Sequence, residues 1–121
     1  MSDLSRPPGK TTIDPEVLLT IARLTTLGVP GITCLAKIPG GVNRLFKTGT
    51  NEGVLISVEN NTVYADLYVV VQHDHNVREV SRNIQTHIAR AFSEMVGMEV
   101  GKVNIHVEDV DYTTEVHPKK L

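Results

Sequence analysis

The sequence predicts an α+β fold in which two helices pack on one face of a small, largely antiparallel sheet of three to four strands. The prediction depends on two capped amphipathic helices, on strands whose apolar residues alternate, and on their order along the chain, α-β-β-β-α-β. Because 121 residues suit one domain with its own core, we expect 11–111 to form that domain, between a flexible N-terminal tail at 1–10 and a polar C-terminal tail at 112–121.

The first helix is predicted over about 15–27. Asp14 can accept hydrogen bonds from the free amides of the first turn, and Pro15 suits the first helical position. Gly28 ends the helix. The predicted core-facing stripe consists of Val17, Leu18, Ile21, Ala22 and Leu24. Leu19 lies outside this stripe, on the more polar side of the helix, and we expect it to be exposed.

Three strands are predicted between the helices, over 32–38, 54–58 and 63–71. Asn60-Asn61 suits a tight turn between the last two, because asparagine tolerates positive φ. A further short strand at 11–13 is an open alternative. The residues of the third strand that share the buried face are Val63, Ala65, Leu67, Val69 and Val71. The residues that point to the opposite, wetter face are Tyr64, Asp66, Tyr68 and Gln72.

The second helix begins after Asn76, which has capping-box spacing to Glu79, and ends at Gly97. A last strand is predicted over about 101–110. The apolar residues of the second helix fall within about 120° of a helical wheel, which defines a core-facing stripe. This stripe consists of Val77, Val80, Ile84, Ile88, Ala91, Phe92 and Met95.

The composition limits the cellular setting and the class of partner. The formal net charge is −2 and the pI is about 6.2, whereas a dedicated duplex-binding domain is usually strongly basic. Cys34 is the only cysteine, which excludes a disulfide framework and fits a reducing, cytoplasmic compartment. No run approaches the roughly 20 apolar residues that a transmembrane helix needs. We therefore expect a cytoplasmic protein without direct membrane insertion.

His73-Asp74-His75 is the one sequence that suggests a metal site, since two histidines on an extended strand end share a face. A zinc site needs three or four ligands, and no HxxxH or CxxC motif supplies the others. Cys34 lies on an apolar alternating strand, where we expect a buried, inert thiol. We therefore expect no metal, cofactor or catalytic residue, and we keep a small metal-dependent enzyme using His73 and His75 as an alternative.

A KH-like nucleic-acid-binding module is the second alternative. The sequence at 28–31 formally matches the G-x-x-G loop of KH domains, but it joins a helix to a strand and contains no basic residue. Arg78, Arg82 and Arg90 could form a basic face on the second helix, although glutamates interleave with them. A solvated helix face explains this pattern better than a nucleic-acid footprint does.

The long connection at 39–52 contains Leu45 and Phe46 between basic and glycine residues. Connections of this length are uncommon in compact domains and are often functional. The two side chains either pack into the core or form an exposed patch that binds a partner. Together with the outlying leucine and the tyrosines of the wetter sheet face, they give the candidate partner-binding residues Leu45, Phe46, Leu19, Tyr64 and Tyr68.

Several short sequences together are typical of one bacterial family. They are Thr12–Leu18, Val29–Ile32, Gly53-Val54, Ile84-Gln85, Met95–Met98 and Val103–Val107. By their order and spacing the chain resembles, over about 10–110, the alkaline-shock-protein and general-stress-protein family of envelope stress response proteins. The sequence His73-Asp74-His75 departs from the family, whose members often have a small or glycine-containing loop at this point.

This resemblance implies a small α+β domain without established catalytic residues. It also implies self-assembly, or docking to a small membrane-anchored protein at the cytoplasmic face of the membrane, in cell-envelope homeostasis under stress. We therefore expect a non-enzymatic scaffold protein whose partners are itself and a membrane-anchored protein. Neither nucleic acid nor a small-molecule substrate is expected.

Overall fold

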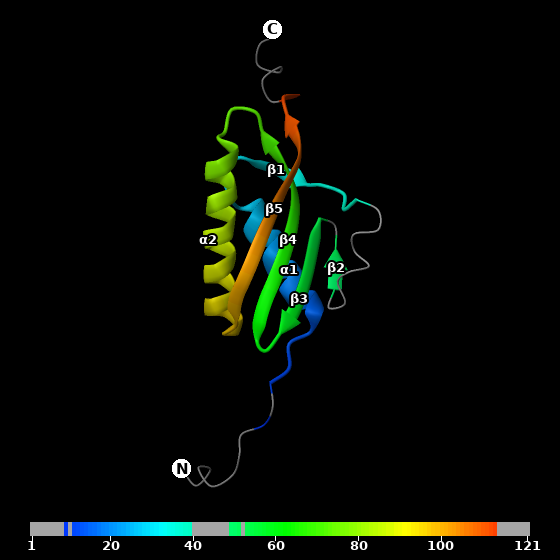
Figure 1. Ribbon diagram of the computed structural model, residues 1–121, viewed down its shortest axis with the longest axis vertical. Helices are drawn as coiled ribbons and strands as arrows, with labels where there is room; N and C mark the ends of the chain where they lie inside the picture. Colours follow the sequence, from blue (N-terminus) through cyan, green and yellow to red (C-terminus); the bar gives the residue numbers. More distant parts are fainter. Residues whose placement is uncertain (1–8, 10, 40–48, 52, 114–121) are drawn as a thin grey trace.

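The computed structural model describes residues 9, 11–39, 49–51 and 53–113. The helices are α1 (Pro15–Leu27) and α2 (Val77–Val96), and the strands are β1 (Ile32–Leu35), β2 (Gly49–Asn51), β3 (Val54–Glu59), β4 (Thr62–Gln72) and β5 (Glu99–Asp111). Both helices pack on one face of a single five-stranded sheet (Figure 1). The α+β class and the predicted order of elements are confirmed. The three-residue β2 is an additional strand within the predicted connection at 39–52.

The central strand of the sheet is β4, which is paired on both edges. Its first half pairs with β3 and its last three residues before Gln72 pair with β1, both antiparallel and on the same edge. The other edge pairs with β5 in parallel along the full length of β4. A parallel neighbour requires a crossover connection, and α2 provides it between β4 and β5. The sheet is therefore antiparallel except for this last pair.

The core lies between the sheet and the two helices. The five residues of β4 predicted to share the buried face are all at most 1% exposed. They pack against α1 and against Ile84, Ile88 and Phe92 of α2, which are all 0% exposed. The alternation in β4 and the central part of the stripe on α2 are thus confirmed. No helix of the described residues is long and apolar enough to cross a membrane.

The local signals at the helix ends are confirmed. The Asp14 side chain accepts a hydrogen bond from the Glu16 amide at 2.8 Å, and the Asn76 side chain accepts one from the Glu79 amide at 3.0 Å. Gly97 ends α2 with φ of 67°, in the left-handed region that favours glycine. The hairpin at Asn60-Asn61 also forms as predicted, with φ of 49° and 62°. Residues 11–13 form no strand.

The two ends of the predicted stripe on α2 are not in the core. Val77 is 39% exposed and Met95 is 66% exposed, so their predicted burial is wrong. Both lie at the same angle around the helix as the buried residues, but they occupy its first and last turns. A helix of 20 residues is about 30 Å long, and only its middle turns are fully covered by the sheet and α1.

Cys34 is exposed, so its predicted burial is also wrong. The register of β1 on β4 shifts between Ile32 and Cys34. Ile32 pairs with Val71 and Cys34 pairs with the adjacent Val70, so β1 has one extra residue between these two pairs. Such a bulge reverses the alternation of side chains beyond it. Ile32 faces the core, whereas Cys34 falls beside Val70 on the face of the sheet opposite the helices.

A substitution at the centre of the core tests the position of α2. Ile88→Ala removes three methyl or methylene carbons from a fully buried side chain, so we expect the free energy of unfolding to fall by about 2–5 kcal/mol. Thr86→Ala, on the exposed side of the same helix, should change it by at most about 0.5 kcal/mol. Urea unfolding followed by circular dichroism measures both. Equal stabilities of the two variants would contradict the position of α2.

The bulge in β1 is tested by the reactivity of Cys34. We expect a thiol-reactive dye to modify the folded protein rapidly and in full, because the thiol is exposed. Cys34→Ser should not react. Modification that requires denaturant would show that Cys34 faces the core and that the register shift is absent.

Candidate functional site

Helix α1 carries apolar side chains on two faces. The face toward the core buries Leu18, Leu19, Ile21, Ala22 and Thr26. The face toward solvent exposes Val17 by 43%, Leu24 by 56% and Leu27 by 38%. The only charged residues of α1 are Glu16 and Arg23. A helix that is apolar around most of its circumference is usually covered on both sides.

The predicted orientation of α1 is therefore wrong. Leu19 is 2% exposed, whereas Val17 and Leu24 of the predicted stripe face solvent. The buried arc is rotated by about 90° from the predicted one, on a wheel of 3.6 residues per turn. Thr26 makes this rotation acceptable, because its hydroxyl donates a hydrogen bond to the Ala22 carbonyl at 2.8 Å and can be buried.

The exposed face of α1 continues onto the end of α2. The two helices contact each other and run in roughly opposite directions (Figure 1), and residues from the start of α1 and the end of α2 line a common groove. This groove is open and mainly apolar, with a volume of about 360 Å³. It is lined by Glu16, Val17, Thr20, Ile21, Met95 and Val96.

We call Val17, Leu24, Leu27 and Met95 the apolar helical surface. Six large apolar side chains are exposed among the described residues, and four of them belong to this surface. Contiguous exposed apolar side chains on a small domain usually mark a site of interaction with another molecule. The sequence did not reveal this surface, because its apolar pattern places Val17, Leu24 and Met95 in the predicted core-facing stripes.

The remaining candidate partner-binding residues have different outcomes. Leu45 and Phe46 lie outside the described residues, so both alternatives for them stay predictions. Tyr64 is half-buried, and its ring lies over Gly101, where an added Cβ would overlap it. Glycine at this position therefore gives the ring its space. A role for Tyr64 in binding a partner stays a prediction.

Tyr68 is 4% exposed, so the expectation that it offers an open binding surface is wrong. Its ring stacks on His106 with centroids 4.4 Å apart, and His106 Nε2 lies 2.8 Å from Asp66 Oδ1. Burial, followed by the nearby carboxylates of Asp66 and Glu108, raises the pKa of the Tyr68 phenol. The parallel pairing of β4 with β5 brings Tyr68 beside His106, and no local sequence signal indicated this contact.

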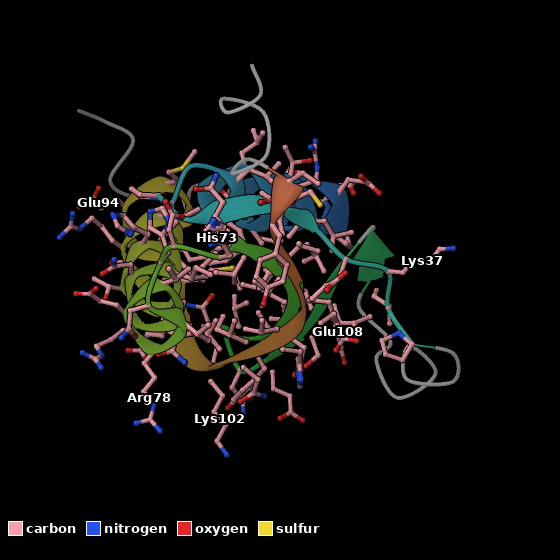
Figure 2. All side chains as sticks on the ribbon, turned by 90° about the horizontal axis from the view of Figure 1, so that it is seen from above. Lys37, His73, Arg78, Glu94, Lys102 and Glu108 are labelled. Carbon is pink, nitrogen blue, oxygen red and sulfur yellow. The ribbon has the colours of Figure 1, made fainter. Side chains whose placement is uncertain are left out.

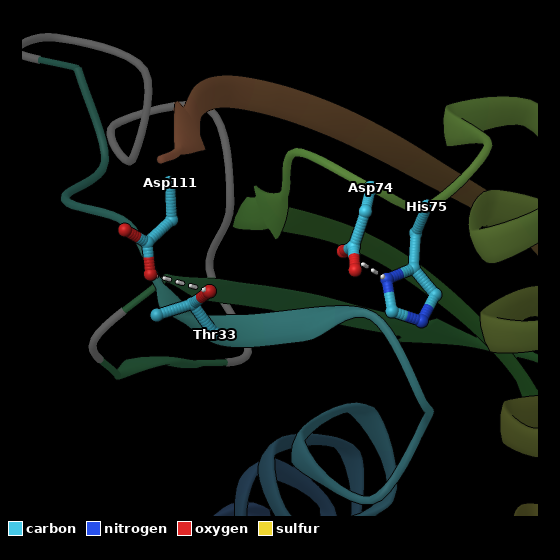
Figure 3. Close-up of polar contacts among 4 residues, drawn as sticks. All are labelled: Thr33, Asp74, His75 and Asp111. Carbon is cyan, nitrogen blue, oxygen red and sulfur yellow. Dashed lines mark hydrogen bonds and ion pairs between the residues drawn. The ribbon is translucent and has the colours of Figure 1, made fainter. Parts of the chain in front are cut away.

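The histidines of the suggested metal site have different partners. His75 Nδ1 lies 3.1 Å from Asp74 Oδ1, and the His73 ring stacks on Tyr112. Figure 3 shows two separate polar contacts. One joins Asp74 and His75, and in the other the Thr33 hydroxyl donates a hydrogen bond to the Asp111 carboxylate. Among the described residues no group of three or more His, Cys, Asp or Glu could hold a metal ion.

Hydrogen bonds hold the pKa of the Asp111 carboxyl below its usual value. The largest contribution comes from the Thr113 hydroxyl, followed by the Thr113 amide and the Thr33 hydroxyl, and His73 adds a favourable charge interaction. Thr33 belongs to β1, whereas Asp111 ends β5, so this carboxylate joins two strands at one end of the sheet. Its contacts are those of a structural group.

The features that suggested nucleic-acid binding have structural explanations. Gly31 of the G-x-x-G match has φ of 100°, and an added Cβ would lie 2.8 Å from the Val80 side chain and 2.9 Å from His75. The glycine is therefore required by a turn packed against α2. Arg78 and Glu94 project into solvent from different flanks of α2 (Figure 2), so the exposed part of this helix carries charges of both signs.

Comparison with known proteins identifies related sequences. The family model for the alkaline shock protein 23 family, described as having a cell envelope-related function, matches residues 4–112. The uncharacterized protein YqhY of Bacillus subtilis (strain 168) is 26% identical over 115 residues, which cover 93% of this chain and 85% of YqhY. The uncharacterized protein Spy1535 of Streptococcus pyogenes serotype M6 is 34% identical over 105 residues, which cover 84% of this chain and 79% of that protein.

Solved structures of MamM CTD variants share the fold. One has a TM-score of 0.58 at 12% sequence identity and covers 82% of this chain and 100% of its own. Another has a TM-score of 0.55 at 11% identity and covers 79% of this chain and 95% of its own. At this level of identity the likeness concerns the fold alone.

Two leucines of α1 test which face of the helix is buried. Leu19→Gln places an amide in the core and should lower the free energy of unfolding by at least about 3 kcal/mol. Leu24→Gln, the same change on the solvent side, should alter it by at most about 0.5 kcal/mol, since glutamine forms helices about as well as leucine. Thermal and urea unfolding of both variants measure the difference. A larger loss of stability for Leu24→Gln than for Leu19→Gln would show that α1 has the orientation predicted from the sequence.

Proposed function

The chain belongs to the alkaline shock protein 23 family, whose function is cell envelope-related, and from this premise we propose that it is a non-enzymatic scaffold protein of cell-envelope homeostasis under stress. The resemblance seen in the sequence is thereby confirmed. In the proposed function the protein acts by self-association or by docking to a membrane-anchored partner. It works at the cytoplasmic face of the membrane and is held there by the partner.

The apolar helical surface is the observation that carries this proposal. Leu24 and Met95 are both more than half exposed, and Met95 lines the groove together with Val17. Covering a half-exposed side chain of this size contributes about 1 kcal/mol. Several such side chains around a groove therefore favour association with another protein, and they give an isolated monomer no benefit.

The ionisable side chains support a structural protein. His106 contacts Asp66 and stacks on Tyr68, and Asp111 accepts hydrogen bonds from two threonines. Each of these groups links neighbouring strands or orders a strand end. Groups used in this way hold the sheet together and are not aimed into the groove, whose lining is mainly apolar.

A double substitution on the apolar helical surface tests the proposed function. Leu24→Gln/Met95→Gln should leave the fold intact, because both side chains are exposed. It should weaken self-association in sedimentation velocity, or reduce the share of protein that sediments with membranes from cells, or both. We expect at least a fivefold effect, since roughly 2 kcal/mol of apolar contact is lost.

The matched control removes two exposed apolar side chains elsewhere. Val77→Gln/Tyr112→Gln changes the other two large exposed apolar residues of the described part of the chain. It should behave as the parent in both assays. If the surface variant also matches the parent in both assays, the apolar helical surface is not the site of interaction and the proposed function loses its support.

A further inference from the structure

We propose that the apolar helical surface is a two-fold interface with a second copy of this chain, in which α1 packs antiparallel to α1 of the other copy. Leu24 of each copy then enters the groove of the other. The inference rests on the proposed function and goes beyond it, since it names the partner, the contact residues and the symmetry.

Each copy presents both halves of the contact. The groove is lined by Val17, Thr20 and Ile21 at the start of α1, whereas Leu24 projects from the same side of the helix two turns later. The separation of Val17 and Leu24 is seven residues, or about 10.5 Å along the helix. A surface that carries both a projecting side chain and a groove can pair with its own copy, which is the requirement for a two-fold contact.

The symmetry axis would pass close to Thr20. This residue lies near the midpoint between Val17 and Leu24, on the solvent side of α1, and it is half-buried. Helices that cross at a small side chain can approach to about 8–10 Å between their axes. At that distance the second copy's Leu24 reaches the side chain of Val17.

The charges of α1 select the antiparallel arrangement. Glu16 and Arg23 are the only charged residues of this helix, and they are also seven residues apart, on one flank of the apolar face. An antiparallel pair brings Glu16 of each copy beside Arg23 of the other, which gives two opposite-charge contacts. In a parallel two-fold pair the same flanks lie on opposite sides of the contact, so neither charge would meet an opposite charge of the other copy. Within the described part of the chain neither side chain makes an ion pair.

Met95 completes the wall of the groove from α2. It is 66% exposed in one copy, and an unbranched thioether side chain adapts to the shape of an entering leucine. The interface is small, so it belongs to the class of transient contacts. We expect a dissociation constant of about 1–100 µM.

A charge exchange tests the pairing. Glu16→Lys and Arg23→Glu each turn two attractive contacts into two repulsive ones, so each should weaken self-association at least about tenfold in sedimentation equilibrium at low salt. Glu16→Lys/Arg23→Glu should restore the dissociation constant to within about threefold of the parent. Added salt should weaken the parent dimer and strengthen the dimer of the Glu16→Lys variant.

A cross-link tests the position of the axis. In a Cys34→Ser background, Thr20→Cys should form a disulfide-linked dimer under mild oxidation, because residues near a two-fold axis meet their own counterparts. Thr86→Cys, the same change on the exposed side of α2, should remain largely monomeric. Equal cross-linking of the two variants would overturn the proposed axis.

The outcomes separate this inference from the proposed function. If neither single charge reversal weakens self-association, the two-fold contact is wrong. The protein would then still be a scaffold, but one that assembles in a different way. If the protein stays monomeric while Leu24→Gln/Met95→Gln still reduces its sedimentation with membranes, the surface docks a different partner and the inference is wrong. Restoration by the double exchange, together with the Thr20→Cys cross-link, establishes the interface.

Discussion

The pairing of β4 on both edges is the constraint on which the rest of the structure depends. Because β5 occupies one whole edge in parallel, α2 must cross over the sheet to connect them, and it does so on the face where β4 presents its apolar residues. β3 and β1 divide the other edge between them. Since α2 covers the β5 side of that face, α1 fills the remaining area over β1 and β3, and its outer side stays in contact with solvent.

Features that depend on neighbouring residues could be predicted from the sequence. Asp14, Asn76 and Gly97 act on amides and carbonyls within one or two turns, so their effects are visible in a short stretch of residues. The alternation in β4 is equally local, since a strand buried on one face must repeat every two residues. These signals determined the class, the order of elements and most of the boundaries.

Features that depend on distant residues could not be predicted in this way. The face of α1 that is buried depends on its packing against the sheet. Because the helix has only two charged residues, its sequence shows no clear polar face from which the buried face could be predicted. The exposure of Cys34 results from a register shift against β4, which the sequence of β1 alone does not reveal. The apolar helical surface was hidden by the same error, because exposed apolar residues resemble core residues in sequence.

The outer strand of the sheet has a consequence for the form of any assembly. β5 pairs with β4 alone among the described strands, and an open strand edge can recruit further strands without limit. On β5 the Gln85 side chain of α2 donates a hydrogen bond to the Val103 carbonyl at 2.9 Å, so an incoming chain would have to compete with this side chain for that carbonyl. Growth by strand addition, the route to amyloid-like fibres, is thus disfavoured at this position of the edge. A two-fold contact between helices, by contrast, stops at two copies, because each copy uses its one surface.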